Sequence, residues 1–367
     1  MSGKLFDFCI GNPPYQESRE TTKDMPVYHT FMDAAYLVAN KVELITPAKF
    51  LFNSGATPKK WNEERLKDNH FKVLHYEGNS SKVFSNTSIP GGVVISYRDD
   101  SCDYGPIEIF SAFPEMNSIR NKIISMENHK GLDTIMYPYS AYTLSEAFWN
   151  DHPERRARVE YIIKNRNKLS KEEKKGELSN FRIITTNIFD LLPELFFDSK
   201  PNDGKDYCAI VGRRNGTRCT KYILQKYINV ADNYKYYKVL ISIGDGAAGQ
   251  IGNPIPARIT GQPLVIEPNT GYTQTFQSIG SVKTIKEADN IAKYIKTKFA
   301  RTAVGILKIT QHYPVDKWKY VPLQDFTSSS DIDWTKSVHE IDLQLYRKYG
   351  LSVEEINFIE THVKEMV

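Results

Sequence analysis

The sequence predicts an α/β fold whose first part is a sheet with parallel strands. An apolar, strand-like run at residues 6–11 precedes residues 27–39, where apolar side chains recur every three or four positions, as on a helix. Residues 41–47 form a second short apolar run, which ends at a proline. Strand, helix and strand in this order make a parallel crossover unit, right-handed by default. A helix at 58–68 and a strand at 71–76 are expected to follow.

The composition is that of a soluble globular protein. Of the 367 residues, 40% are hydrophobic and 25% are charged, and the length suffices for two domains. The chain lacks a membrane-spanning apolar run and the features of a signal peptide, so we expect a cytoplasmic protein that does not bind membranes. Its four cysteines are scattered without paired spacing or companion histidines, which argues against a metal site or a disulfide framework. The net charge of +4 permits nucleic-acid binding without requiring it.

The first strand leads into the loop Asn12-Pro13-Pro14-Tyr15. The two prolines fix their own φ angles and keep Asn12 out of the helical region, so the loop is stiff. The carboxamide oxygen of Asn12 and the carbonyl of Pro13 can each accept a hydrogen bond from an NH2 group, and the Tyr15 ring offers a face on which a base can stack. This combination suits chemistry on an exocyclic amine.

Asn-Pro-Pro-Tyr after an apolar strand resembles the catalytic motif of the DNA amino-methyltransferases, in particular the adenine-N6 enzymes of bacterial restriction-modification systems. Residues 45–51 resemble the proline-containing segment that follows the next strand in these enzymes, and we expect the two loops to be neighbours. Residues 83–95 resemble a later motif whose aromatic residue packs against the extruded adenine, and this role passes to Phe84. Taken singly, these segments also fit a proline turn, a strand-to-helix connection and a core aromatic. Their order along the chain favours the resemblance.

The resemblance implies a partial Rossmann-like methyltransferase sheet that acts on double-stranded DNA with S-adenosylmethionine as cofactor. The flipped adenine would be held by the catalytic residues Asn12, Pro13, Pro14, Tyr15 and Phe84, with Lys49 contacting the DNA, and its amine would attack the methyl group directly. The family's glycine-rich cofactor loop comes before the Asn-Pro-Pro-Tyr strand, but here only five residues precede Phe6. The cofactor-binding residues are therefore unknown, and we expect a companion chain to supply that half. The chain would be a split subunit, a fragment, a decayed enzyme or a permuted one.

The permuted alternative would use Gly244 to Gly249, which match Gly-x-Gly-x-x-Gly after a strand at 237–243, with Glu267 as the ribose acid. Such a site needs a helix directly after the glycines. The glycines and prolines that follow would break any helix there, so we favour a flexible loop.

We place the catalytic half at residues 1–110 and an α+β target-recognition or specificity domain at residues 111–367. Strands at 207–211 and 218–223 flank an Asn-Gly pair, which is a strong hairpin signal. The hairpin would present DNA-binding residues whose side chains read guanine and adenine edges: Arg213, Arg214, Asn215 and Arg218. An exposed basic hairpin without a function is the alternative. The charged run at 152–175 would face either phosphates or solvent.

The remaining pattern resembles, diffusely, the carboxyl-terminal specificity domain of combined restriction-modification enzymes. A helical stretch at 285–309 is followed by a closing pair of short helices separated at Gly350. Two functions stay open: an adenine-N6 DNA methyltransferase, or a non-catalytic DNA-binding specificity protein that needs a partner for the cofactor. A nuclease is disfavoured, because neither two acids and a lysine at strand spacing nor a histidine-rich metal site occurs in the sequence.

Overall fold

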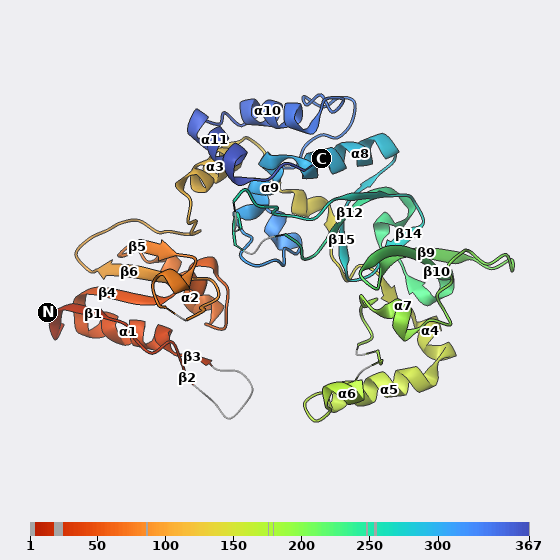
Figure 1. Cartoon of the computed structure of the whole chain (residues 1–367), viewed down its shortest axis with the longest axis horizontal. Coiled ribbons are helices and arrows are strands. Elements are labelled where there is room, and N and C mark those ends of the chain that lie inside the picture. The colour runs from red at the N-terminus through yellow and green to blue at the C-terminus, as the bar shows by residue number, and fades with distance from the viewer. Residues whose placement is uncertain are drawn as a thin grey trace. The chain divides into compact units, whose positions relative to one another are not determined.

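The computed structural model describes residues 4–17, 25–85, 87–174, 176–178, 180–246, 249–252 and 255–366 (Figure 1). It has a mixed α/β fold with several small sheets and divides into two compact units, Met1–Pro114 and Glu115–Val367. Within the described residues, no helix is both long and apolar enough to cross a bilayer.

The first unit contains a four-stranded sheet in the order β1-β4-β6-β5. Its strands are β1 (Phe6–Gly11), β4 (Ala39–Pro47), β5 (Phe71–Glu77) and β6 (Val93–Asp99). β1 and β4 are parallel, with Phe8 opposite Lys41, and helix α1 (Tyr28–Val38) connects them, which confirms the predicted crossover. β6 runs antiparallel to both neighbours. In the described part of the connection from β5 to β6, the only helix is the short 3-10 helix η2 (Ser80–Lys82), so the strand returns antiparallel without a crossover helix there.

The core of this unit lies where α1 and α2 (Lys59–Lys67) meet β4. Met32 of α1 and Trp61 and Leu66 of α2 pack there with Val42 and Leu44 of β4. The indole N–H of Trp61 also donates to the Asp33 carboxylate at 2.9 Å, which ties α2 to α1. A two-stranded ribbon, β2 (Gln16–Glu17) and β3 (Met25–Pro26), lies between β1 and α1 in the chain.

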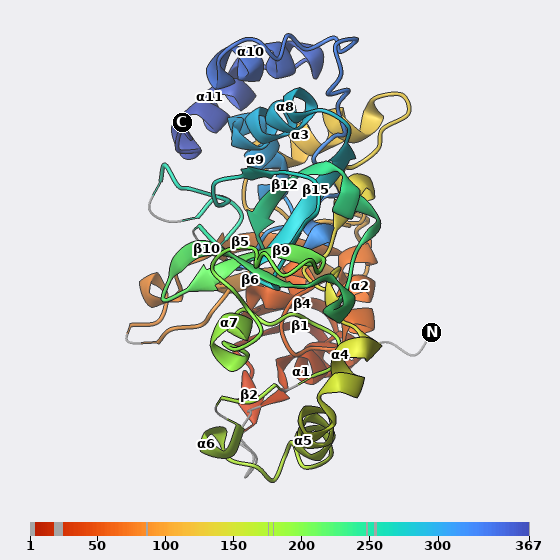
Figure 2. The same cartoon turned by 90° about the vertical axis from the view of Figure 1, so that its right-hand side faces the viewer.

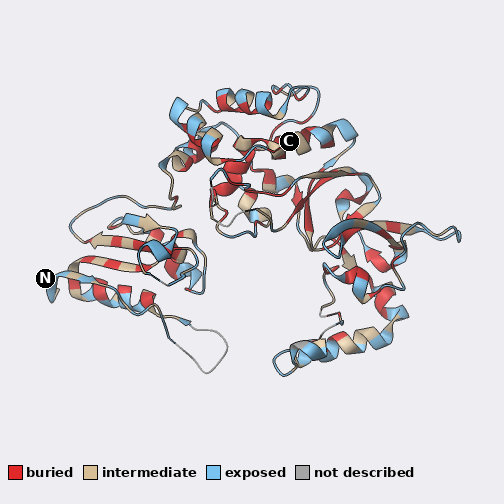
Figure 3. Ribbon diagram, viewed as in Figure 1, coloured by how far each residue is buried: buried red, intermediate tan, exposed pale blue. Residues whose placement is uncertain are grey.

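The outer strand of this sheet is apolar and uncovered. Phe6, Phe8 and Ile10 alternate along β1 and are 58%, 63% and 77% exposed, as the pale colour of this strand shows (Figure 3). β1 pairs only with β4 among the described strands, so its other edge carries free backbone groups.

The described residues of the second unit form three sheets, ordered β13-β12-β15-β7, β10-β9-β14 and β11-β8. The strands are β7 (Met136–Tyr137), β8 (Thr143–Leu144), β9 (Tyr207–Arg214), β10 (Thr217–Leu224), β11 (Ile228–Asn229), β12 (Tyr237–Ser242), β13 (Leu264–Ile266), β14 (Thr270–Tyr272) and β15 (Phe276–Val282). β9 and β10 form the predicted hairpin, whose turn residues Asn215 and Gly216 both have positive φ.

The helices of this unit include a carboxyl-terminal group, one of which packs against the sheet β13-β12-β15-β7. The helices are α3 (Pro114–Ser125), α4 (Glu146–Asp151), α5 (Pro153–Lys164), α6 (Lys171–Lys174), α7 (Ile188–Leu191), α8 (Ile285–Lys296), α9 (Lys298–Gly305), α10 (Val338–Lys348) and α11 (Val353–His362). Both views place α8 beside β12 and β15 (Figures 1 and 2). The predicted helical stretch at 285–309 is interrupted at Thr297, whose hydroxyl caps α9, and the predicted closing pair is separated at Gly350.

Candidate functional site

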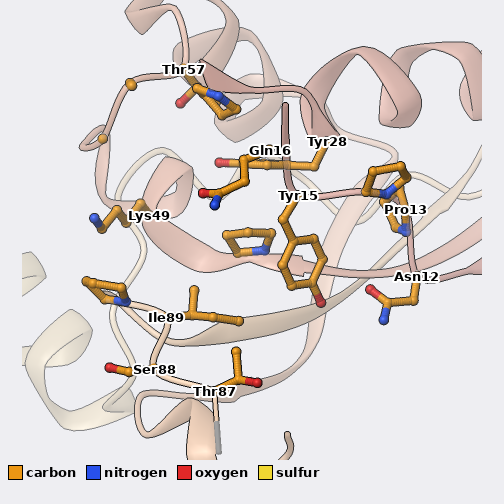
Figure 4. Close-up of a pocket in the computed structure, with 16 residues that line it drawn as sticks. Asn12, Pro13, Tyr15, Gln16, Tyr28, Lys49, Thr57, Thr87, Ser88 and Ile89 are labelled. Carbon is orange, nitrogen blue, oxygen red and sulfur yellow. The ribbon is translucent and has the colours of Figure 1, made fainter. Parts of the chain in front are cut away.

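A cavity of about 660 Å³ opens in the first unit beside the ends of β1 and β4 (Figure 4). Its lining is mostly neutral and rich in proline and hydroxyl side chains: Asn12, Pro13, Pro14, Tyr15, Gln16, Pro26, Tyr28, Pro47, Lys49, Gly55, Ala56, Thr57, Thr87, Ser88, Ile89 and Pro90. Lys49 is the only charged member of this lining.

Two parallel strands bring the first two loops together. The Asn12 to Tyr15 loop follows β1, and Pro47 and Lys49 follow β4, so both leave the same edge of the sheet. The predicted neighbourhood of these loops is thus confirmed. The Tyr15 carbonyl accepts a hydrogen bond from the Val27 N–H at 3.1 Å, which fastens the loop to the start of α1.

Two side chains of this loop have polar groups that form no hydrogen bond with the described residues. Asn12 is exposed, and its carboxamide forms no hydrogen bond with the part of the chain that the structure describes. The Tyr15 hydroxyl is buried without a partner among those residues, and burial raises its pKa. The Tyr15 ring stands between Asn12 and the Thr87 to Ile89 segment, whereas Lys49 lies across the cavity from Asn12 (Figure 4).

Phe84 does not line the cavity, but its ring packs against Tyr15, which does. Its ring lies edge-on to Tyr15, with centroids 6.3 Å apart and planes at 68°. The buried hydroxyl of Ser80 sets this part of the wall, because it donates to the Thr87 carbonyl and accepts from the Ile89 N–H. Phe84 is therefore separated from the cavity by Tyr15 in this conformation.

The wall at residues 87–90, which belongs to the motif-like segment at 83–95, depends on two glycines. Gly91 and Gly92 have φ of +91° and +78°, in the region that side chains disfavour. A Cβ on Gly91 would lie 2.6 Å from Cγ of Lys49, so the missing side chain makes room for the lysine stem. The Lys49 ammonium has no carboxylate partner among the described residues, which leaves its charge for a ligand. In the sequence, the Gly-Gly pair directly after Pro90 was the signal that could have indicated this turn.

The hairpin arginines in the second unit differ in their surroundings. Arg213 and Arg218 lie directly opposite each other across β9 and β10, and both are exposed. Arg214 is on the other face and pairs with Asp190 of α7 at 3.1 Å. Asn215 occupies the turn with φ +50°. The structure thus separates the four predicted residues into a facing pair, an ion-paired arginine and a turn residue.

Three arginines of the charged run at 152–175 have carboxylate partners. Arg155 pairs with Glu194, Arg156 with Glu146 and Glu160, and Arg158 with Glu177. These pairs favour the interpretation of α5 as a solvated helix face.

The glycine-rich segment at 244–249 does not form a dinucleotide site with Glu267. Ala247 and Ala248 lie outside the described residues, and no helix follows within the described part of the loop. β12 and β13 are antiparallel, with Lys238 opposite Ile266, so Glu267 lies beside the start of β12 while Gly244 follows its end. Among the described residues, no group of three or more His, Cys, Asp or Glu side chains could hold a metal ion.

Comparison with known proteins gives one family match. Residues 2–84 match the model of the Eco57I restriction-modification methylase family, which confirms the predicted resemblance for this part of the chain. The crystal structure of the type IIG restriction endonuclease BpuSI is 10% identical, with a TM-score of 0.35 over 92% of this chain and 48% of the BpuSI chain. The present chain thus spans about half the length of BpuSI. None of the curated proteins compared with the chain matched it.

Proposed function

Because residues 2–84 match the restriction-modification methylase family, we propose that the chain is the catalytic and recognition portion of a DNA adenine-N6 methyltransferase. One observation carries this proposal: the Asn12 to Tyr15 loop faces a cavity with unengaged acceptors on one side and the unpaired Lys49 on the other. A flipped nucleotide presents both an amine and a phosphate, so it matches the two sides of this cavity.

The residues of the cavity would bind and orient the base. The Asn12 carboxamide oxygen and the Pro13 carbonyl accept the two amine hydrogens, which aims the nitrogen lone pair away from the loop. The Tyr15 ring stacks on the base, an interaction worth about 1–3 kcal/mol, and Phe84 holds that ring in place. Lys49 neutralises a phosphate of the target strand.

The described residues do not form a complete site for S-adenosylmethionine. The lining includes no carboxylate that could bind ribose hydroxyls, and the Gly91-Gly92 turn leads into β6 rather than a helix.

A companion segment or chain that pairs with β1 would supply the cofactor half. The outer edge of β1 has free backbone groups and carries Phe6, Phe8 and Ile10, all more than half exposed. An edge strand with these properties is a ready site for another strand. Covering it would bury apolar surface next to the catalytic loop, because Asn12 directly follows this strand.

The second unit would recognise the DNA sequence, with the β9–β10 hairpin as the contacting element. The alternative is a non-catalytic specificity protein that keeps the base pocket and lacks methyl transfer. The incomplete cofactor site is the observation that favours this alternative.

The identity of the modified base distinguishes these functions. The full chain, purified together with the companion chain that pairs with β1, is incubated with S-adenosylmethionine and unmethylated genomic DNA, and the DNA is hydrolysed to nucleosides for mass spectrometry. We expect N6-methyldeoxyadenosine. N4-methyldeoxycytidine as the product would refute the adenine assignment. DNA binding with sequence preference but without any methylated base would favour the non-catalytic alternative.

A further inference from the structure

The hairpin carries two arginines whose arrangement is unfavourable in the free protein. Arg213 of β9 and Arg218 of β10 are a directly opposed cross-strand pair. In such pairs the Cβ atoms lie about 4.5–5.5 Å apart, and like charges repel. Neither guanidinium has a carboxylate partner within the described ranges of the chain.

Two other basic side chains of the hairpin have carboxylate partners. Arg214, one residue along β9, pairs with Asp190 at 3.1 Å, and Lys221 of β10 pairs with Asp198. The unbalanced charge is therefore confined, on this part of the hairpin, to the face that holds Arg213 and Arg218.

One arginine of the pair is also held in position. The Arg218 guanidinium lies 5.8 Å from the ring centroid of Phe276, a buried residue at the start of β15. A cation within about 6 Å of an aromatic ring centroid is attracted by the ring quadrupole, which favours this position of the Arg218 side chain. Arg213, directly across the ladder, extends from the same face and is exposed.

We propose that Arg213 and Arg218 together bind one backbone phosphate of duplex DNA, and that Arg214 does not contact the DNA. This inference rests on the proposed function and replaces base reading by these arginines with phosphate binding. A phosphodiester has one negative charge and two free oxygens, so it can accept from both guanidinium groups and relieve their repulsion. Arg214 is excluded because it lies on the other face of the hairpin and its charge is balanced by Asp190, which accepts from its Nε–H.

The salt dependence of DNA binding tests the pair. Binding of the full chain to a mixed-sequence duplex is measured over a range of salt concentrations for wild type, Arg213→Gln, Arg218→Gln, the double variant and the control Arg214→Gln. Each phosphate contact contributes about −0.9 to the slope of log K against log salt concentration. We expect the double variant to lose about one unit of slope, each single variant to lose much less because the remaining arginine still neutralises the phosphate, and Arg214→Gln to lose none.

Each other outcome has a defined meaning. A loss of about two units in the double variant would refute a shared phosphate, and an unchanged slope would refute the site while leaving the proposed function intact. A larger loss on a preferred duplex than on mixed sequence would mark the pair as base contacts. A wild-type chain that binds no DNA would overturn the proposed function itself. Without DNA, Arg213→Gln should not lower the melting temperature, because it removes repulsion; a clear decrease would contradict the proposed arrangement.

Discussion

Replacing Gly92 with alanine should disrupt the wall of the cavity and destabilise the first unit. Gly92 has φ +78°, and an added Cβ would overlap the Glu77 carbonyl oxygen and lie 2.7 Å from the Gly78 Cα. These neighbours are backbone atoms at the end of β5, which cannot rotate away. The Gly92 carbonyl also accepts a hydrogen bond from the Ala48 N–H at 3.0 Å. A shift of the Gly91-Gly92 turn would therefore move it away from the segment that follows β4 and carries Lys49.

The expected cost combines two contributions. A side chain in the left-handed region costs about 1–2 kcal/mol. Overlap in a packed region adds about 1–3 kcal/mol. Gly105 provides a matched control, because its φ is +72° and a Cβ there would meet nothing within 4 Å. Gly105→Ala should therefore show only the first cost, and the loss of entropy in the unfolded chain is the same for both changes.

Hydrogen exchange with mass spectrometry measures this difference within the first unit. Peptides from β4 and β6 report the free energy of opening of the sheet in wild type and in the two variants. We expect Gly92→Ala to lower it by about 1–3 kcal/mol more than Gly105→Ala. Equal losses in the two variants would refute the assigned packing of the Gly91-Gly92 turn.

Three further predictions follow from the structure. Tyr15→Ala and Phe84→Ala should both reduce the fluorescence gain of 2-aminopurine at the target position of a duplex selected by the protein. The loss should be larger for Tyr15→Ala, because Phe84 acts through Tyr15. A larger loss for Phe84→Ala would contradict this ranking of the two residues. Phe8→Lys should reduce self-association of the isolated chain in sedimentation experiments, because it places a charge on the exposed edge strand β1. Unchanged self-association would show that the chains do not associate through β1. Burial raises the pKa of Asp342 to about 7, although two backbone N–H groups donate hydrogen bonds to its carboxylate. The contribution of protonated Asp342 to the free energy of unfolding should therefore be lost as the pH rises from about 4 to about 7. Asp342→Asn should remove this part of the pH dependence of unfolding, and an unchanged pH dependence would refute the raised pKa of Asp342.

The sequence was most informative where local chemistry determines structure. Asn12 to Tyr15 could be placed at the carboxyl end of a strand because the apolar run, the two prolines and the following helical pattern leave one simple topology. The hairpin was predictable because Asn215 and Gly216 tolerate positive φ at both turn positions. In each case, the decisive interactions lie within a few residues of one another.

The sequence was least informative where distant residues meet. Arg214 and Asp190 are 24 residues apart, and their ion pair forms only because α7 packs beside the hairpin. The packing of Phe84 against Tyr15 likewise depends on how the β5–β6 connection folds back toward β1. Neither local propensity nor a motif specifies such contacts.

The central claim is that the Asn12 carboxamide holds the amine of the target base. The most direct test compares binding to a selected duplex in which one adenine is present or is replaced by purine, which lacks the exocyclic amine. Wild type should prefer adenine at one position, and Asn12→Ala should reduce this preference by about 1 kcal/mol, roughly fivefold, through loss of one hydrogen bond. Asn69→Ala, an exposed residue before the start of β5, serves as the control and should keep the full preference. An adenine-to-purine ratio in Asn12→Ala equal to that of wild type would contradict the claim.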